Sequence, residues 1–148
     1  MNFLIVTGLS GAGKSMAVNA LEDIVFFCID NIPAGLLPRI LDFAQQGENQ
    51  LSRVAVVMDI RGLHSVQETN EALEALDEKK MPYDILFLDA SDAAIRRRYK
   101  ETRRVHPMTI SEGIPVSEAI TKERQILQPL RERAKYVIDT SLLSTAQN

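Results

Sequence analysis

Hydrophobic residues of the chain come in short continuous runs, broken only at Asp59, that are separated by longer segments with helical spacing. The runs cover residues 3–6, 25–29, 54–60, 85–88 and 136–138. Continuous rather than alternating runs are typical of strands in a parallel sheet that crossover helices cover on both faces. Their alternation with helical segments predicts one α/β domain over residues 1–148, with an open, mostly parallel sheet of about five strands.

The segments between the runs carry apolar stripes at helical intervals, within residues 36–44 and 66–76. Ser91 is a favourable N-cap for a helix through the basic residues that follow it. Two segments depart from the pattern. Residues 106–115 contain two prolines and a glycine, which predicts a mobile loop. Pro129 predicts a kink or a break in the helix expected over residues 117–133.

Composition limits the class of protein. The chain has 148 residues, 45% of them hydrophobic, and its single cysteine, Cys28, excludes a disulfide scaffold. No apolar stretch approaches the roughly 18 residues of a membrane-spanning helix, and the first six residues lack the basic segment of a secretory signal. We therefore expect a cytoplasmic protein with no membrane partner. The sequence leaves the oligomeric state undetermined and is compatible with a homo-oligomer.

Charge is distributed unevenly along the chain. The net charge is -3, yet the nine residues 96–104 contain six basic side chains and one acidic side chain. A basic cluster on an acidic body predicts a local anion site rather than a surface coated for nucleic acid. The alternative is an ordinary solvated helix face.

A phosphate-binding loop is the strongest motif. Residues 8–15 match the pattern G-x-x-x-x-G-K-[ST] directly after the first apolar run and before a helical segment. Glycines allow the backbone amides to approach phosphate oxygens, and the helix that follows presents unpaired amides and the positive end of its dipole. Lys14 is expected to reach the β- and γ-phosphates, and the Ser15 hydroxyl to bind Mg²⁺. The predicted nucleotide-binding loop is thus Gly8, Leu9, Ser10, Gly11, Ala12, Gly13, Lys14 and Ser15.

Aspartates stand at the ends of four predicted strands: Asp30, Asp59, Asp89 and Asp139. In doubly wound sheets, ligands bind beyond the carboxyl ends of the strands, where all four would lie. Asp59 and Asp89 each follow an apolar run of the kind that ends in the Mg²⁺-binding carboxylate of phosphate-loop proteins. The sequence does not decide between these two, and each aspartate can alternatively be an N-cap or turn residue.

Two further groups have the chemistry of phosphoryl transfer. Asp30, in the segment Asp-Asn-Ile-Pro, is placed to position an acceptor hydroxyl or a water beside the phosphate loop if the sheet has kinase-like order, or else it belongs to a turn. Arg97, Lys100 and Arg104 lie at helical spacings on one face, where they would stabilise a transferred phosphoryl group, with the loop after them as a lid hinge. Lys14, Asp30 and Arg104 are therefore the candidate catalytic residues. His106 is expected to end a helix rather than to catalyse.

Six segments, spread from end to end, resemble the RapZ/YvcJ family of bacterial nucleotide-binding proteins. They are residues 5–15 (IVTGLSGAGKS), 27–33 (FCIDNIP), 59–61 (DIR), 87–92 (FLDASD), 98–107 (RYKETRRVHP) and 137–141 (VIDTS). The Asp-Asn-x-Pro block and the Arg-rich block that ends in His-Pro are more specific than the phosphate loop alone. The resemblance implies a phosphate-loop fold of the nucleoside-kinase type.

The resemblance also implies binding of ATP and GTP with Mg²⁺ and weak hydrolysis. The family's GTP segment maps onto Asp59, Ile60, Arg61 and Gly62, where Gly62 replaces a small polar residue. One carboxylate cannot serve both a guanine edge and the Mg²⁺ shell, because the two sites lie too far apart. We favour the metal role, so Ser15 and Asp59 are the expected metal ligands.

Family members that act as RNase adapters bind small regulatory RNAs and present them to an endoribonuclease, which links amino-sugar synthesis to RNA decay. The resemblance places those contacts in a second, C-terminal domain that is absent from this sequence. RNA and the endoribonuclease are therefore expected partners only through that domain. The alternative function is a small-molecule kinase of the nucleoside or sugar type that uses ATP, because such kinases also combine a phosphate loop, a carboxylate after the second strand and an Arg-rich lid.

Overall fold

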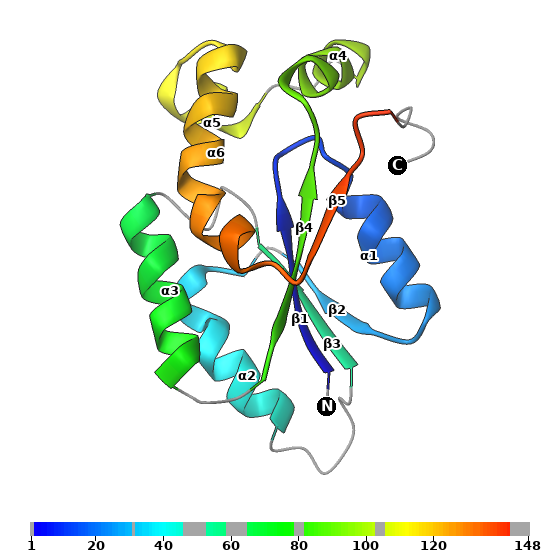
Figure 1. Cartoon of the computed structure of the whole chain (residues 1–148), viewed down its shortest axis with the longest axis vertical. Helices are drawn as coiled ribbons and strands as arrows, with labels where there is room; N and C mark the ends of the chain where they lie inside the picture. Colours follow the sequence, from blue (N-terminus) through cyan, green and yellow to red (C-terminus); the bar gives the residue numbers. More distant parts are fainter. Residues whose placement is uncertain are drawn as a thin grey trace.

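The computed structural model describes residues 2–30, 32–45, 53–58, 65–78, 82–102 and 106–142. Within them, five strands form one parallel sheet in the order β2-β3-β1-β4-β5 (Figure 1). The predicted α/β fold with a parallel five-stranded sheet is confirmed. The strands are β1 (Asn2–Gly8), β2 (Phe27–Ile29), β3 (Arg53–Val57), β4 (Asp84–Asp89) and β5 (Tyr136–Asp139).

Helices lie on both faces of the sheet (Figure 1). Helix α1 (Lys14–Asp23) covers one face, and α2 (Leu37–Gln45), α3 (Val66–Glu78) and α6 (Val116–Arg133) lie on the other; a short 3-10 turn, η1 (Ala34–Leu36), precedes α2. Helices α4 (Asp92–Thr102) and α5 (Pro107–Glu112) lie at the end of the sheet where β1 and β4 finish. This end, which also carries the phosphate loop, is where ligands bind in open α/β sheets.

The central strands are buried as the continuous runs predicted, but β5 is not. Residues of β1, β3 and β4 form the middle of the apolar core together with side chains of α2, α3 and α6. In contrast, Tyr136, Val137 and Ile138 of β5 are 48%, 45% and 47% exposed. The expectation of burial on both faces is therefore wrong for β5 and for β2, where Phe27 is 54% exposed. Both strands end the described sheet, so their faces receive less cover than those of an inner strand.

The second predicted strand begins two residues later than its apolar run. Helix α1 is followed by a turn in which Val25 has a φ of 69°, a left-handed conformation that β-branched residues rarely adopt. Ile24 and Val25 are exposed in this turn, and β2 starts only at Phe27. The apolar run at 25–29 thus combines turn and strand residues.

The predicted start of α4 is confirmed, whereas the predicted effect of Pro129 on α6 differs from the structure. The Ser91 hydroxyl accepts a hydrogen bond from the Ala94 amide at 3.1 Å, which confirms Ser91 as the N-cap of α4. Helix α6 continues through Pro129 to Arg133, so the helix is not split. Proline removes one helical hydrogen bond, and the long buried stripe of this 18-residue helix outweighs that loss: Ala119, Ile120, Glu123, Ile126, Leu127 and Leu130.

The predicted mobile loop at residues 106–115 is wrong, because its centre forms helix α5. The ring Nδ1 of His106 accepts a hydrogen bond from the Met108 amide at 3.0 Å and so caps the helix, with Pro107 in its first turn. Gly113 ends α5 with a φ of 69°. Proline at the start and glycine just past the end are helix signals as much as loop signals. His106 therefore begins a helix and does not end one.

Candidate functional site

The phosphate loop joins β1 to α1 and depends on glycine at three positions. Gly8, Gly11 and Gly13 have φ values of 145°, 87° and 106°, a region that favours glycine. At Gly8 a Cβ atom would also overlap the carbonyl oxygen of Leu88, because β1 and β4 pair closely there. The loop therefore has the strand–turn–helix geometry that brings backbone amides and the N-terminus of α1 together.

Lys14 lies at the start of α1, and its side chain turns back along the loop. Its Nζ atom donates hydrogen bonds to the carbonyl oxygens of Gly8 and Leu9, each at 3.0 Å. Ser15 is exposed in the first turn of α1. A lysine ammonium, the helix N-terminus and an exposed hydroxyl thus meet at one place, and their chemistry fits a polyphosphate with its Mg²⁺.

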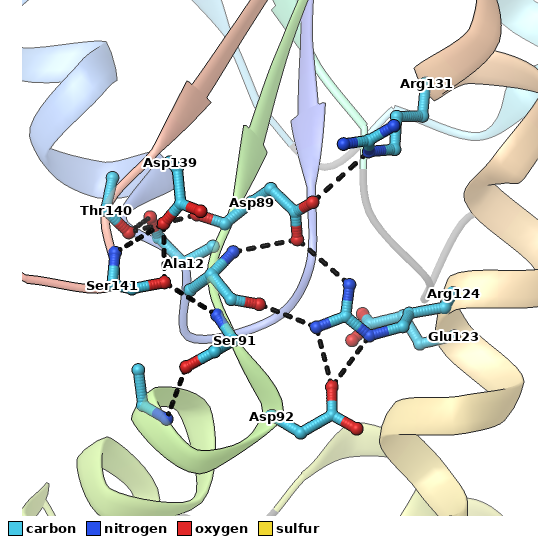
Figure 2. A network of polar contacts seen from close by, with 12 residues as sticks. Ala12, Asp89, Ser91, Asp92, Glu123, Arg124, Arg131, Asp139, Thr140 and Ser141 are labelled. Atoms are coloured by element: carbon cyan, nitrogen blue, oxygen red, sulfur yellow. Dashed lines mark hydrogen bonds and ion pairs between the residues drawn. The ribbon is translucent and has the colours of Figure 1, made fainter.

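Two residues, Arg98 and Thr140, hold the second half of the loop by hydrogen bonds. Arg98 of α4 is only 4% exposed and donates to the Gly11 carbonyl at 3.1 Å and to the Thr140 hydroxyl at 3.0 Å. The Thr140 hydroxyl donates to the Ala12 carbonyl at 2.8 Å (Figure 2). The C=O of Ala12 and the N–H of Gly13 belong to one planar peptide and point in opposite directions. With its carbonyl partner bonded to Thr140, the Gly13 amide therefore points away from Thr140.

The guanidinium group of Arg98 is buried, and burial disfavours its charged form. Burial lowers the pKa of Arg98, and the neighbouring Arg97 lowers it further, while Asp139 and Glu101 act in the opposite direction. The Arg98 guanidinium also donates to the carbonyl oxygen of Thr140. Arg98 thus donates hydrogen bonds to the backbone of the loop and to the residue after β5. The side chains of Arg97 and Lys100 on the same helix are exposed to solvent.

A buried pair lies on the far side of Ser10. The Ser10 amide donates to both carboxylate oxygens of Glu123, at 3.0 and 3.1 Å, and the Ser10 hydroxyl donates to Oε2 at 2.6 Å. His106 Nε2 lies 3.0 Å from Oε1 of the same carboxylate. The side chains of Glu123 and His106 are both completely buried. Helix α6 is therefore connected directly to the phosphate loop, and the start of α5 is connected to it through Glu123.

Asp89, one of the two candidates for the Mg²⁺ carboxylate, is instead held by two arginines (Figure 2). Its oxygens lie 3.0 Å from Arg124 Nη1 and 3.2 Å from Arg131 Nε. Burial opposes the charge of Arg124, but hydrogen bonds to Asp92 and Asp89 outweigh this effect and raise the pKa of Arg124. Asp89 thus fastens β4 to α6, and its charge is already compensated.

The two aspartates at the ends of the outer strands are exposed. Asp139 accepts hydrogen bonds from the hydroxyl and the amide of Ser141, which lower the pKa of Asp139, as do Arg98 and Arg124 at longer range. This is the turn role that the sequence left open. Asp30 follows β2, and strand β3 lies between β2 and β1. Both β1 and β2 end at the same edge of the parallel sheet, and the predicted catalytic role of Asp30 stays a prediction.

Several predicted residues cannot be compared with the structure. Asp59, Ile60, Arg61, Gly62 and Arg104 lie outside the described residues, so the predicted GTP segment, the predicted metal carboxylate and one predicted catalytic arginine stay predictions. In the part of the chain that is described, no three histidine, cysteine, aspartate or glutamate residues form a metal site. No described helix is long and apolar enough for a membrane span.

Sequence reasoning missed the residues that support the loop, namely Arg98, Thr140, Glu123 and His106 in their observed roles. Only Glu123 had a local signal. It occupies a position on the apolar stripe of α6, between Ile120 and Ile126, where a carboxylate requires a buried partner.

The fold is similar to that of small-molecule kinases. Shikimate kinase from Bacteroides thetaiotaomicron superposes with a TM-score of 0.57 at 17% sequence identity, covering 99% of this chain and 91% of the kinase. A gluconokinase from Sinorhizobium meliloti superposes with a TM-score of 0.51, also at 17% identity, covering 93% of this chain and 82% of the gluconokinase. At this level of identity the likeness shows a phosphate-loop kinase fold and nothing about substrate.

Sequence relatives are much more similar. A nucleotide-binding protein of Moorella thermoacetica is 49% identical over 148 residues, which are 97% of this chain and 48% of the relative. A second, from Agathobacter rectalis, is 47% identical over 147 residues, 99% of this chain and 50% of the relative. The chain thus spans about half the length of the curated relatives it matches. The model of the RapZ-like N-terminal domain matches residues 1–148, and the chain belongs to this family.

Proposed function

We propose that the chain binds ATP or GTP with Mg²⁺ in its phosphate loop and acts as a regulatory domain with slow hydrolysis. The observation that carries this proposal is the loop itself: three glycines in left-handed conformations and Lys14 turned back over the loop's first two residues. The relatives named as nucleotide-binding proteins support it. Calorimetric titration with MgATP and MgGTP tests it, and absence of heat and of competition on folded protein would refute it.

In the proposed binding mode, amides at the N-terminus of α1 and the Lys14 ammonium contact the β- and γ-phosphates. The Ser15 hydroxyl would hold Mg²⁺, which neutralises charge on the phosphates. We assign the second metal ligand to Asp59 rather than Asp89, because Arg124 and Arg131 already compensate the charge of Asp89. Ile60, Arg61 and Gly62 then belong to the same nucleotide segment, and Arg104 and Lys14 are the proposed stabilisers of the transferred phosphoryl group.

Replacing Asp59 with Asn is expected to weaken MgATP and MgGTP binding alike, by about tenfold or more, since one charged metal ligand is lost. Without Mg²⁺, the variant and the wild-type chain should bind each nucleotide with nearly equal affinity. Calorimetry with and without Mg²⁺ measures both quantities. A loss confined to GTP would instead assign Asp59 to the guanine base.

The role of the whole protein is a wider proposal, since the relatives are about twice as long as this chain. We propose that nucleotide occupancy here controls an attached C-terminal domain in a cytoplasmic RNase adapter. RNA and an endoribonuclease would be bound by that domain, and amino-sugar synthesis would be the process controlled.

A small-molecule kinase is the second candidate. The kinase-like fold and the exposed Asp30 at the carboxyl end of β2 favour it. A kinase turns over ATP rapidly only with its acceptor, whereas a switch is slow and indifferent to acceptors. Incubating the chain with labelled ATP and a panel of nucleosides, sugars and other hydroxyl compounds distinguishes them. We expect no labelled product; one acceptor phosphorylated at ~1–100 s⁻¹ would establish the kinase.

A further inference from the structure

A buried carboxylate contacts the phosphate loop, a buried histidine contacts that carboxylate, and the binding mode above uses neither. Glu123 of α6 receives the amide and the hydroxyl of Ser10, and His106 contacts the same carboxylate from the start of α5. Ser10 and Glu123 are 113 positions apart in the sequence. The completely buried carboxylate in this long-range contact costs free energy unless its hydrogen bonds are satisfied.

The contacts define the form of both side chains. The Met108 amide donates to His106 Nδ1, so this nitrogen carries no proton. The proton of the neutral ring is then on Nε2, which donates to Glu123 Oε1 at 3.0 Å. Each of these partners of Glu123 is a donor, namely the Ser10 amide, the Ser10 hydroxyl and the His106 ring. This set suits an ionised carboxylate, which only accepts hydrogen bonds.

The carboxylate also decides what Ser10 can do. With both Oε1 and Oε2 within 3.1 Å of its nitrogen, the Ser10 amide points toward α6. The Ser10 amide is therefore taken up by Glu123, whereas the Gly13 amide points away from Thr140 in the second half of the loop. Glu123 thus fixes the first half of the loop, and Arg98 and Thr140 fix the second half.

We propose that Glu123 and His106 are positioning residues for nucleotide binding, which hold Ser10 so that the rest of the phosphate loop keeps its binding shape. This inference rests on the proposed function. The pair joins the loop to α5 through one chain of hydrogen bonds, from the Met108 amide through His106 and Glu123 to Ser10. The shape of the loop and the start of α5 therefore depend on each other.

Glu123→Gln tests the carboxylate. Glutamine has nearly the same volume but offers one acceptor and adds a donor, so it cannot receive all three donors. We expect the Kd for MgATP to rise about ten- to a hundredfold, the range for losing hydrogen bonds to a charged group. Glu118→Gln, at an exposed position in the first turn of the same helix, is the matched control and should leave the Kd unchanged. Thermal unfolding by circular dichroism checks that both variants are folded.

His106 offers a pair of variants that separate positioning from helix capping. Glutamine keeps a donor where Nε2 lies and loses the cap acceptor, whereas asparagine keeps an acceptor where Nδ1 lies and loses the donor. We expect His106→Gln to stay within about threefold of the wild-type Kd and His106→Asn to weaken binding about tenfold. The opposite order would show that the cap of α5 matters and the Nε2 donor does not, and an equal loss in both would show that the donor has no role of its own. Either result would overturn the inference.

An amide measurement makes the test independent of affinity. In the wild-type chain the Ser10 amide proton should be shifted strongly downfield in the nitrogen–proton NMR spectrum and exchange slowly, and Glu123→Gln should remove both effects. If wild type binds nucleotide while Glu123→Gln binds equally well or leaves the Ser10 amide unchanged, this inference fails alone. If wild type binds no nucleotide, the proposed function fails, and this inference with it.

Discussion

Replacement of Lys14 by alanine is expected to weaken MgATP and MgGTP binding by at least about a hundredfold. Phosphate oxygens would lose charge-assisted hydrogen bonds from the ammonium group, each worth about 1.5–3 kcal/mol. The same ammonium now contacts the carbonyl oxygens of Gly8 and Leu9, so a smaller loss of stability, about 1 kcal/mol, should accompany the change. Calorimetric titration measures the affinity, and urea unfolding measures the stability.

Lys122→Ala is the matched control for this variant. It removes the same charge from the half-exposed side of α6, where Lys122 faces Glu112 at 3.6 Å. Nucleotide affinity should then be unchanged, since exposed ion pairs contribute little. If Lys14→Ala kept wild-type affinity, the assignment of the nucleotide site to this loop would be incorrect.

Gly8→Ala is expected to have the largest effect on folding, a loss of about 3–5 kcal/mol in the free energy of unfolding. A Cβ atom at Gly8 would overlap the backbone of Leu88, and a backbone cannot move aside as a flexible side chain can. The φ of 145° adds strain for any residue with a side chain. Because the chain has no tryptophan, far-ultraviolet circular dichroism in urea is the suitable measurement.

Two other glycines separate the causes of that loss. Gly113→Ala introduces strain alone, because its φ is 69° but nothing lies within 4 Å of the new Cβ atom, and about 1 kcal/mol should be lost. Gly35→Ala has neither strain nor a close neighbour and should stay within about 0.5 kcal/mol of wild type. Equal losses at Gly8 and Gly113 would show that the overlap with Leu88 is not the cause.

The fold class and the phosphate loop could be predicted from the sequence because both depend on residues that are close together in the chain. All four residues of the run 54–57 are buried, and the glycines of the loop adopt positive φ values that other residues rarely adopt. Burial at β5 could not be predicted in this way, since it depends on the place of the strand in the sheet. The prolines and the glycine of residues 106–115 were ambiguous because they mark the ends of a helix as well as a loop.

The support of the site could be predicted least. The Thr140 hydroxyl and the Ala12 carbonyl are 128 positions apart, and Arg98 and Gly11 are 87 apart. No local pattern reports such pairs, which exist only after β1, β4 and β5 have been placed side by side. Glu123 is the instructive case, since an acid on an apolar stripe indicated a buried partner but did not say which residue it was.

The exposed side chains of β5 have a practical consequence for each nucleotide titration. Its three apolar residues and the exposed Leu142 form an apolar surface beside the edge of the described sheet. An edge strand of this kind can pair with a strand of another molecule and so lead to aggregation. Dilution series at fixed nucleotide ratio therefore belong in each assay, so that self-association is not mistaken for a change in affinity.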